Sequence, residues 1–180
     1  DDPLIIAGQG TVGRELADQA EAVDAKLDAV LSPCGGGGLV SGCATAIRAR
    51  CPGTDVFAVE PEGFDDTARS LVSGIRERAQ DDATSFCDAL LAPTPGEITW
   101  SINSEMVDDY LVVSEDDIAY AVSYAFRYLK LVVEPGGAAA LAALLGNKLE
   151  VAGETVGLVL SGGNMDPQTL QHCLQQYPSV

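Results

Sequence analysis

Basic residues and histidine are scarce in this chain of 180 residues. Lys and Arg number 10 against 27 Asp and Glu, which gives a formal net charge of −17, and His172 is the single histidine. Such an acidic surface repels phosphate backbones and anionic lipids, so neither nucleic acid nor a membrane surface is an expected partner. A lone histidine in a polar C-terminal segment also argues against histidine-based acid–base chemistry.

Long apolar runs and metal-type cysteine spacings are absent as well. No apolar run in the sequence approaches the length that a bilayer crossing needs. The five cysteines show no Cys-x-x-Cys spacing, and their odd number is typical of reduced thiols, which predicts a cytoplasmic protein. Because the chain starts at Asp1 without a methionine, we expect a fragment or a processed form.

Strand and helix patterns alternate along the chain, which is typical of a parallel sheet covered by helices. The expected strands are 4–7, 28–32, 55–59, 110–113 and 155–160. The expected helices are 11–22, 39–50, 66–79, 137–145, one that starts with a capping box at Ser114 and Asp117, and one from Pro167. We therefore expect an α/β fold, a parallel twisted sheet with helices on both faces, in one domain over residues 1–180.

Four consecutive glycines, Gly35, Gly36, Gly37 and Gly38, separate an expected strand from an expected helix. Without side chains in the way, their amides can converge on an anion, and the N-terminus of the following helix adds further N–H donors. A flexible linker would be longer, would contain Ser and would not lie between a strand and a helix. The glycines therefore predict a phosphate-binding loop.

A second glycine pattern, Gly8-x-Gly10-x-x-Gly13, matches the dinucleotide-binding fingerprint. That fingerprint also requires an acidic residue near the end of the next strand. Ser32 stands there, whereas Asp28 opens the strand. We expect a tight strand-to-helix turn, and a nucleotide-binding oxidoreductase domain is the weakest alternative.

Three other loops carry polar groups after expected strands. Four carboxylates lie within the seven residues from Glu60 to Asp66, and oxygen ligands of this kind suit Mg²⁺ or Ca²⁺. Taken alone, that loop is better explained as a solvated acidic segment. Ser161, before two glycines, fits either a ligand-facing hydroxyl or a turn that leads into a helix, and Glu134 fits a turn carboxylate.

Together these segments resemble the pyridoxal-phosphate-dependent serine/threonine dehydratase and serine racemase family, which has a tryptophan-synthase-β-like fold. The resemblance covers nearly the whole chain, in order and at the family's spacing. Its segments are Ile6-Ala7-Gly8-Gln9-Gly10-Thr11, Pro33-Cys34-Gly35-Gly36-Gly37-Gly38-Leu39, Val59-Glu60-Pro61 with Asp65-Asp66, Cys87-Asp88-Ala89-Leu90, Val113-Ser114-Glu115-Asp116-Asp117-Ile118, Leu131-Val132-Val133-Glu134-Pro135-Gly136-Gly137 and Leu160-Ser161-Gly162-Gly163-Asn164. The tetraglycine loop and Ser161-Gly162-Gly163-Asn164 are its specific motifs.

The resemblance implies a site for pyridoxal 5'-phosphate. The loop amides would bind the phosphate, Ser161 would hydrogen-bond the pyridine nitrogen, and Glu134 and Ala89 would lie beside the ring. The implied cofactor-binding residues are Gly35, Gly36, Gly37, Gly38, Leu39, Ala89, Glu134, Ser161 and Gly162. The resemblance also implies a cation, Mg²⁺ or Ca²⁺, bound by the carboxylates of Glu60 and Asp66 and the carbonyl of Phe64, in place of the solvated segment.

The lysine that the family uses to bind the cofactor aldehyde has no counterpart here. In the family it lies in a Ser-Phe-Lys-x-Arg-Gly segment, and none of Lys26, Lys130 and Lys148 has that context. We therefore assign no catalytic residue to this chain. We expect most of the family's large domain without its small domain and N-terminal segment, inactive by itself and a homodimer when complete.

The activity implied is elimination of water from a β-hydroxy amino acid, giving a 2-oxo acid and ammonia. A neutral Ser161 hydroxyl leaves the pyridine nitrogen less charged than a carboxylate would, which favours elimination over transamination. An amino-acid racemase and a non-catalytic module that binds phosphate or pyridoxal phosphate stay open. So does the choice among threonine, serine and 3-hydroxyaspartate.

Overall fold

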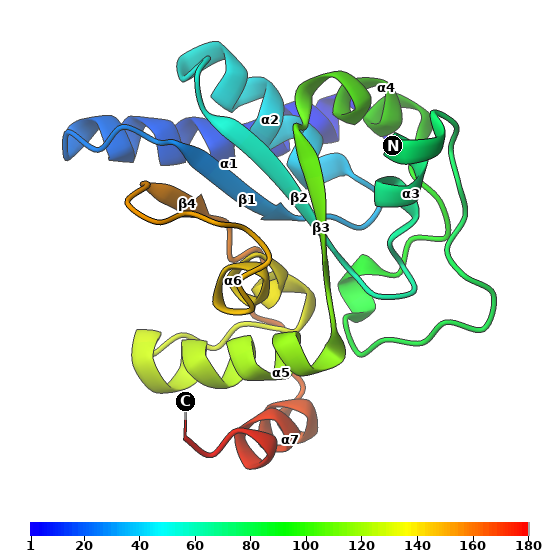
Figure 1. The fold of residues 1–180 in the computed structure, drawn as a ribbon, viewed down its shortest axis with the longest axis vertical. Helices are drawn as coiled ribbons and strands as arrows, with labels where there is room; N and C mark the ends of the chain where they lie inside the picture. The colour runs from blue at the N-terminus through cyan, green and yellow to red at the C-terminus, as the bar shows by residue number, and fades with distance from the viewer. Residues whose placement is uncertain (180) are drawn as a thin grey trace.

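Four parallel strands form the sheet in the part of the chain that the structure describes, residues 1–179 of this computed structural model. They are β1 (Ala29–Pro33), β2 (Asp55–Pro61), β3 (Asp109–Val113) and β4 (Val156–Leu158). Their order in the sheet is β3-β2-β1-β4 (Figure 1). In this register Leu31 lies between Phe57 and Leu158. Because all strands run the same way, their carboxyl ends share one edge, where ligands of such sheets usually bind.

Helices cover both faces of this sheet (Figure 1). One side carries α1 (Pro3–Ala22), α2 (Gly38–Arg50) and α4 (Glu97–Met106), and the other α5 (Glu115–Tyr124), α6 (Ala139–Leu145) and α7 (Pro167–Gln176). Shorter pieces are α3 (Asp66–Ser73), η1 (Asp88–Leu90), the π-helical η2 (Ala125–Leu129) and η3 (Gly136–Ala138). The predicted α/β architecture is confirmed.

The strands β1, β2 and β3 are mostly apolar because each of them contributes to two cores. Successive side chains alternate between the faces of a strand. Leu31 and Val59 are fully buried in the cluster formed with α5 and α6. Val30 and Val56 are fully buried in the cluster on the other face, together with Ile47 of α2. This double burial explains the continuous apolar runs in the sequence.

The first predicted strand is wrong, because residues 4–7 belong to the single long helix α1. The helix begins after Asp2, whose carboxylate accepts hydrogen bonds from the amides of Leu4 (2.8 Å) and Ile5 (3.2 Å). Pro3 occupies the first helical position, where its missing N–H costs nothing. These start signals outweigh the short apolar run that favoured a strand.

The Gly-x-Gly-x-x-Gly match is therefore part of a helix and not a turn. Its second and third glycines lie against the backbone of α2: a Cβ built on Gly10 would be 3.2 Å from the Gly42 carbonyl oxygen. One built on Gly13 would be 2.7 Å from the Cys43 carbonyl oxygen. The glycine spacing therefore reflects the close packing of α1 against α2.

Replacing Gly13 with alanine is expected to lower the free energy of unfolding by about 2 kcal/mol, because the added methyl overlaps backbone that cannot move alone. Gly8→Ala is the matched control in the same helix, since a Cβ at Gly8 meets nothing within 4 Å. Alanine favours a helix over glycine, so this control should gain up to about 1 kcal/mol. Urea denaturation followed by circular dichroism measures both, and equal changes would contradict the packing explanation.

Other elements differ from expectation mainly at their ends. The helix expected over 66–79 stops at Ser73, where Gly74 adopts a φ of 76°. Helix α4 was not predicted. The capping box is confirmed, since the Asp117 amide donates to the Ser114 hydroxyl (3.2 Å) and the Ser114 amide to the Asp117 carboxylate (3.0 Å). Over the described residues, none of the helices combines the length and apolar character needed to cross a membrane.

Candidate cofactor and cation sites

A cavity of about 290 Å³ lies at the carboxyl edge of the sheet, where β1 ends. Its lining residues are Pro33, Gly35, Gly36, Gly37, Gly38, Leu39, Ala89, Leu90, Glu134 and Ser161. The structure thus brings together, from four separate segments, every residue predicted to bind the cofactor except Gly162.

The tetraglycine loop owes its place to contacts on both sides. The Cys34 amide donates to the Val59 carbonyl (2.8 Å), which extends the β1–β2 pairing to the start of the loop. A Cβ on Gly35 would be 3.0 Å from the Leu90 Cα, so η1 packs directly on the loop backbone. Gly37, with φ of 90°, turns the chain into α2. The first amides of α2 have no acceptor within the helix and are available to an anion.

Side chains outside the predicted set hold the same loop from behind. Thr99 Oγ1 donates to the Gly36 carbonyl (2.7 Å). Ser41 Oγ lies 2.7 Å from the Gly37 carbonyl oxygen and 2.7 Å from Asn103 Oδ1. Thr99, Ser41 and Asn103 are all buried. Thr99 and Asn103 are four residues apart, which places them on one face of α4, and this polar pair was the available sequence signal.

Gly162 belongs to the site indirectly, through Glu134. The Glu134 amide donates to the Gly162 carbonyl (3.0 Å), and the Glu134 carboxylate accepts from the Asn164 amide (3.0 Å). A Cβ on Gly162 would overlap that carboxylate. Glycine at 162 therefore lets the last loop approach Glu134 beside the cavity.

The acidic loop places Glu60 in the protein interior, not in solvent. Its side chain is fully buried, and its carboxylate accepts from the amides of Thr67 (3.2 Å) and Ala68 (2.8 Å) at the start of α3. Burial raises the pKa of Glu60 to about 8, although these two hydrogen bonds oppose the shift.

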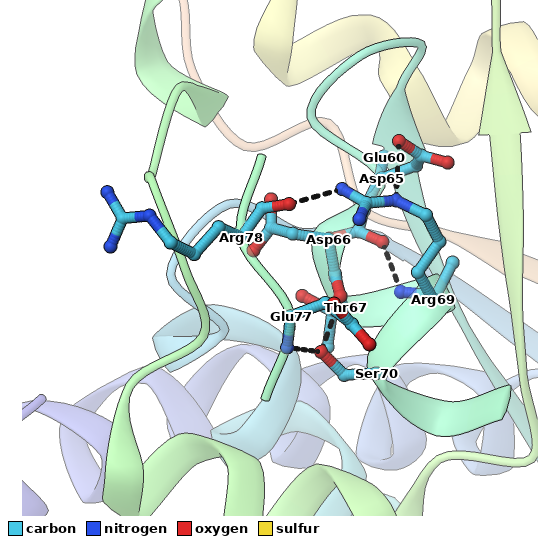
Figure 2. A network of polar contacts seen from close by, with 9 residues as sticks. Glu60, Asp65, Asp66, Thr67, Arg69, Ser70, Glu77 and Arg78 are labelled. Carbon is cyan, nitrogen blue, oxygen red and sulfur yellow. Dashed lines mark hydrogen bonds and ion pairs between the residues drawn. The ribbon is translucent and has the colours of Figure 1, made fainter. Parts of the chain in front are cut away.

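Asp66 provides a second buried carboxylate, and its neighbour Asp65 does not. Asp66 is 2% exposed, and within residues 1–179 its Oδ2 has no hydrogen-bond partner. Burial raises the pKa of Asp66 to about 6. Asp65 instead pairs with Arg69 (3.3 Å), which also donates to the Arg78 carbonyl (2.6 Å; Figure 2). An unpartnered buried carboxylate oxygen suits a cation.

The rest of the acidic loop is held by hydrogen bonds along the chain. The Phe64 amide donates to the Pro61 carbonyl (3.1 Å), which closes a tight turn between β2 and α3. The Ser70 hydroxyl donates to the Asp66 carbonyl and accepts from the Glu77 amide (2.8 Å; Figure 2). No cluster of three or more His, Cys, Asp or Glu ligands occurs in the described part of the chain. The predicted cation ligands differ from such a cluster, because only two of them are side-chain carboxylates and the third is the backbone carbonyl of Phe64.

Within the described residues 1–179, the lining of this cavity contains no lysine. Lys26 pairs with Asp28 (3.3 Å), and Lys148 pairs with Asp117 (3.1 Å). Lys130 is exposed and donates to a backbone carbonyl of its own turn. Each lysine thus has a partner away from the tetraglycine loop.

Comparison with known proteins agrees with the geometry. A family model described as pyridoxal-phosphate dependent enzyme matches residues 1–162. A serine racemase from Dictyostelium discoideum is 39% identical over 177 residues, covering 97% of this chain and 53% of the relative. An L-threo-3-hydroxyaspartate ammonia-lyase from Saccharomyces cerevisiae is 40% identical over 166 residues, covering 92% and 49%.

Solved structures show the same fold. A threonine deaminase from the organism abbreviated T.th. superimposes with a TM-score of 0.87 at 46% identity, covering 92% of this chain and 59% of that chain. The chain spans about half the length of the curated relatives it matches.

Proposed function

The chain belongs to the family of pyridoxal-phosphate-dependent enzymes, and from this premise we propose that it binds pyridoxal 5'-phosphate in the cavity at the end of β1. The observation that carries the proposal is the convergence there of the glycine loop, Glu134 and Ser161. A chain with a net charge of −17 repels phosphate at long range, so local amide donors have to provide the attraction.

Each predicted residue has a distinct task in this proposal. The amides from Gly35 to Leu39 hold the phosphate, and the Ser161 hydroxyl bonds the pyridine nitrogen. Glu134 and Ala89 border the ring, and Gly162, having no side chain, leaves room for the Glu134 carboxylate. When bound, the cofactor supplies a ring that stabilises negative charge on a substrate carbon. Ser161, being neutral, does not hold a proton on the pyridine nitrogen as a carboxylate would.

The reaction we propose for the protein is that of a threonine/serine dehydratase type of ammonia-lyase. A β-hydroxy amino acid loses its α proton and its β hydroxyl as water, and hydrolysis of the product then gives a 2-oxo acid and ammonia. Relatives named for threonine and 3-hydroxyaspartate support this class. Amino-acid racemisation is the second candidate, because the Dictyostelium relative is a serine racemase.

The lysine positions favour a third candidate for the 180 residues alone, a module that binds the cofactor without turnover. We propose that no residue of this chain forms the covalent bond to the cofactor aldehyde, since every lysine lies outside the cavity lining.

A divalent cation, Mg²⁺ or Ca²⁺, is the second ligand that we propose. The carboxylates of Glu60 and Asp66, with the Phe64 carbonyl, would bind it. Its support is the unpartnered buried oxygen of Asp66 and the chemistry of an all-oxygen donor set. We further propose a cytoplasmic homodimer, on the free thiols of the five cysteines and on family habit.

Ser161→Ala is expected to weaken binding of pyridoxal 5'-phosphate about fivefold, because one hydrogen bond to the ring is lost. Absorbance titration of the chain with the cofactor measures the affinity. Ser73→Ala, at the exposed end of α3, should bind as the wild type does.

Borohydride treatment and an ammonia assay separate the candidate functions. Borohydride should leave the cofactor removable from this chain, and incubation with threonine, serine or 3-hydroxyaspartate should release ammonia only once the lysine-bearing segment of a relative is supplied. Failure of the wild type to bind the cofactor would refute the proposed function. Cofactor fixed by borohydride to Lys26, Lys130 or Lys148 would refute the assignment of a non-covalent module.

A further inference from the structure

The direction of two peptide planes in the tetraglycine loop is set by hydrogen bonds from residues that do not line the cavity. The Gly36 carbonyl accepts from Thr99 Oγ1, and the Gly37 carbonyl accepts from both the amide (2.9 Å) and the hydroxyl of Ser41. Glycine has no intrinsic preference that would fix these planes, since its backbone is the most permissive of all residues.

Fixing a carbonyl also fixes an amide. In a trans peptide the C=O of one residue and the N–H of the next lie in one plane and point in opposite directions. Thr99 therefore sets the direction of the Gly37 N–H, and Ser41 sets that of the Gly38 N–H. Both glycines line the cavity. Their donors are turned away from Thr99 and Ser41, which are absent from its lining.

Helix α4 is itself held firmly enough to act as a support. The Asp1 carboxylate accepts from the amides of Ile98 (3.1 Å) and Thr99 (3.0 Å), where α4 begins. Asn103, one turn further along, contacts the Ser41 hydroxyl, and its Nδ2 would lie 2.7 Å from a Cβ on Gly37. The loop, α2 and α4 are thus joined in one buried polar network.

We propose that Thr99 and Asn103 of α4, together with Ser41, are positioning residues that preorganise the Gly37 and Gly38 amides for a phosphate group. The inference rests on the proposed function only for the identity of the ligand as a phosphate. The network removes conformational freedom from the loop before binding, and a preorganised loop binds more tightly than one that must be ordered by its ligand.

The decisive variant is Thr99→Val, which keeps the shape of the side chain and removes its donor. We expect this variant to bind inorganic phosphate and pyridoxal 5'-phosphate about fivefold more weakly than the wild type. In the ligand-free chain, the NMR order parameter of the Gly37 amide should fall from about 0.85, the value of rigid backbone, toward about 0.6, because the plane that it shares with the Gly36 carbonyl is no longer fixed. The Gly38 amide, whose plane Ser41 fixes, should keep its order parameter.

Two variants serve as controls. Thr99→Ser restores the hydroxyl and should recover both the affinity and the order parameter of the Gly37 amide. Ser101→Ala removes a hydroxyl of the same helix that donates to the Ile98 carbonyl (2.8 Å) instead of to the loop, and should change neither. Thermal unfolding confirms that each variant is folded.

The NMR measurement and the binding measurement test two different claims, so each can be contradicted without the other. If Thr99→Val leaves the order parameter of the Gly37 amide at the wild-type value, the positioning role of Thr99 is overturned whether or not phosphate binds. If the order parameter falls as expected while the wild-type chain binds no phosphate, the positioning role stands and the proposed cofactor function is overturned.

Discussion

Gly37→Ala is expected to abolish useful binding of pyridoxal 5'-phosphate, with affinity reduced more than about thirtyfold, and to cost about 3 kcal/mol of folding free energy. Gly37 has a φ of 90°, which costs a residue with a side chain about 1 to 2 kcal/mol. The new Cβ would also lie 2.7 Å from Asn103 Nδ2 and 3.0 Å from the Thr99 Cβ. Relief of that overlap has to move the loop or the side chains of Thr99 and Asn103 that hold it.

Cofactor titration and urea denaturation measure the two effects on one preparation. Gly74→Ala is the matched control, because Gly74 also has a positive φ (76°) but a Cβ there meets nothing within 4 Å. It should lose about 1 kcal/mol through backbone strain alone and keep its affinity for the cofactor. Equal affinity of Gly37→Ala and Gly74→Ala would show that the loop conformation does not matter for binding.

The sheet could be predicted from the sequence because β1, β2 and β3 are buried on both faces. Such strands are continuous apolar runs, and the ends of β1, β2 and β3 were located to within two residues. Helix α1 could not be separated from a strand by the same reasoning, since four apolar residues near its start fit either period. What decides there is the Asp2 cap with Pro3, together with glycines that pack on α2.

Some residues of the candidate site could be assigned from the sequence, and others could not. The tetraglycine loop, Ser161 and Glu134 follow directly from strand ends and from motif order, so the sequence is enough to bring them to one edge. Thr99 and Asn103 could not be assigned, because their role depends on α4 packing behind the loop. That packing is a tertiary contact between segments about sixty residues apart. The spacing of the pair shows that both side chains share a helix face, but not which segment that face contacts.

At the acidic loop, local reasoning from the sequence favoured solvent exposure for two carboxylates that the structure buries. A carboxylate is seldom buried without a partner, so Glu60 and Asp66 were expected at the surface when taken alone. Both are almost completely buried. Their burial has a measurable consequence for the stability of the protein.

In buffer free of divalent cations, the free energy of unfolding is expected to fall by about 4 kcal/mol as the pH rises from about 5 to about 9. The pKa of Glu60 is about 8 in the folded chain against an ordinary value of 4.5. Below both values the carboxyl is protonated whether the chain is folded or not. Between them the unfolded chain releases the proton and the folded chain keeps it, so rising pH favours unfolding.

Asp66 adds to this loss at lower pH, because its folded pKa of about 6 also exceeds its ordinary value of 3.8. Urea denaturation at a series of pH values measures the whole curve. Glu60→Gln should flatten it above about pH 6, since the amide does not titrate. Glu62→Gln, at an exposed position two residues further on, should keep the wild-type slope.

Added Mg²⁺ connects this curve to the proposed cation site. A bound cation stabilises the ionised carboxylates, so millimolar Mg²⁺ should restore most of the stability lost above about pH 7 in the wild type. It should do little for Glu60→Gln, which offers one ionised oxygen ligand fewer. If the wild-type curve is steep and neither Mg²⁺ nor Ca²⁺ changes it, the burial of Glu60 is upheld and the cation site is rejected. The ionised Glu60 carboxylate would then destabilise the fold without any bound metal to compensate its charge.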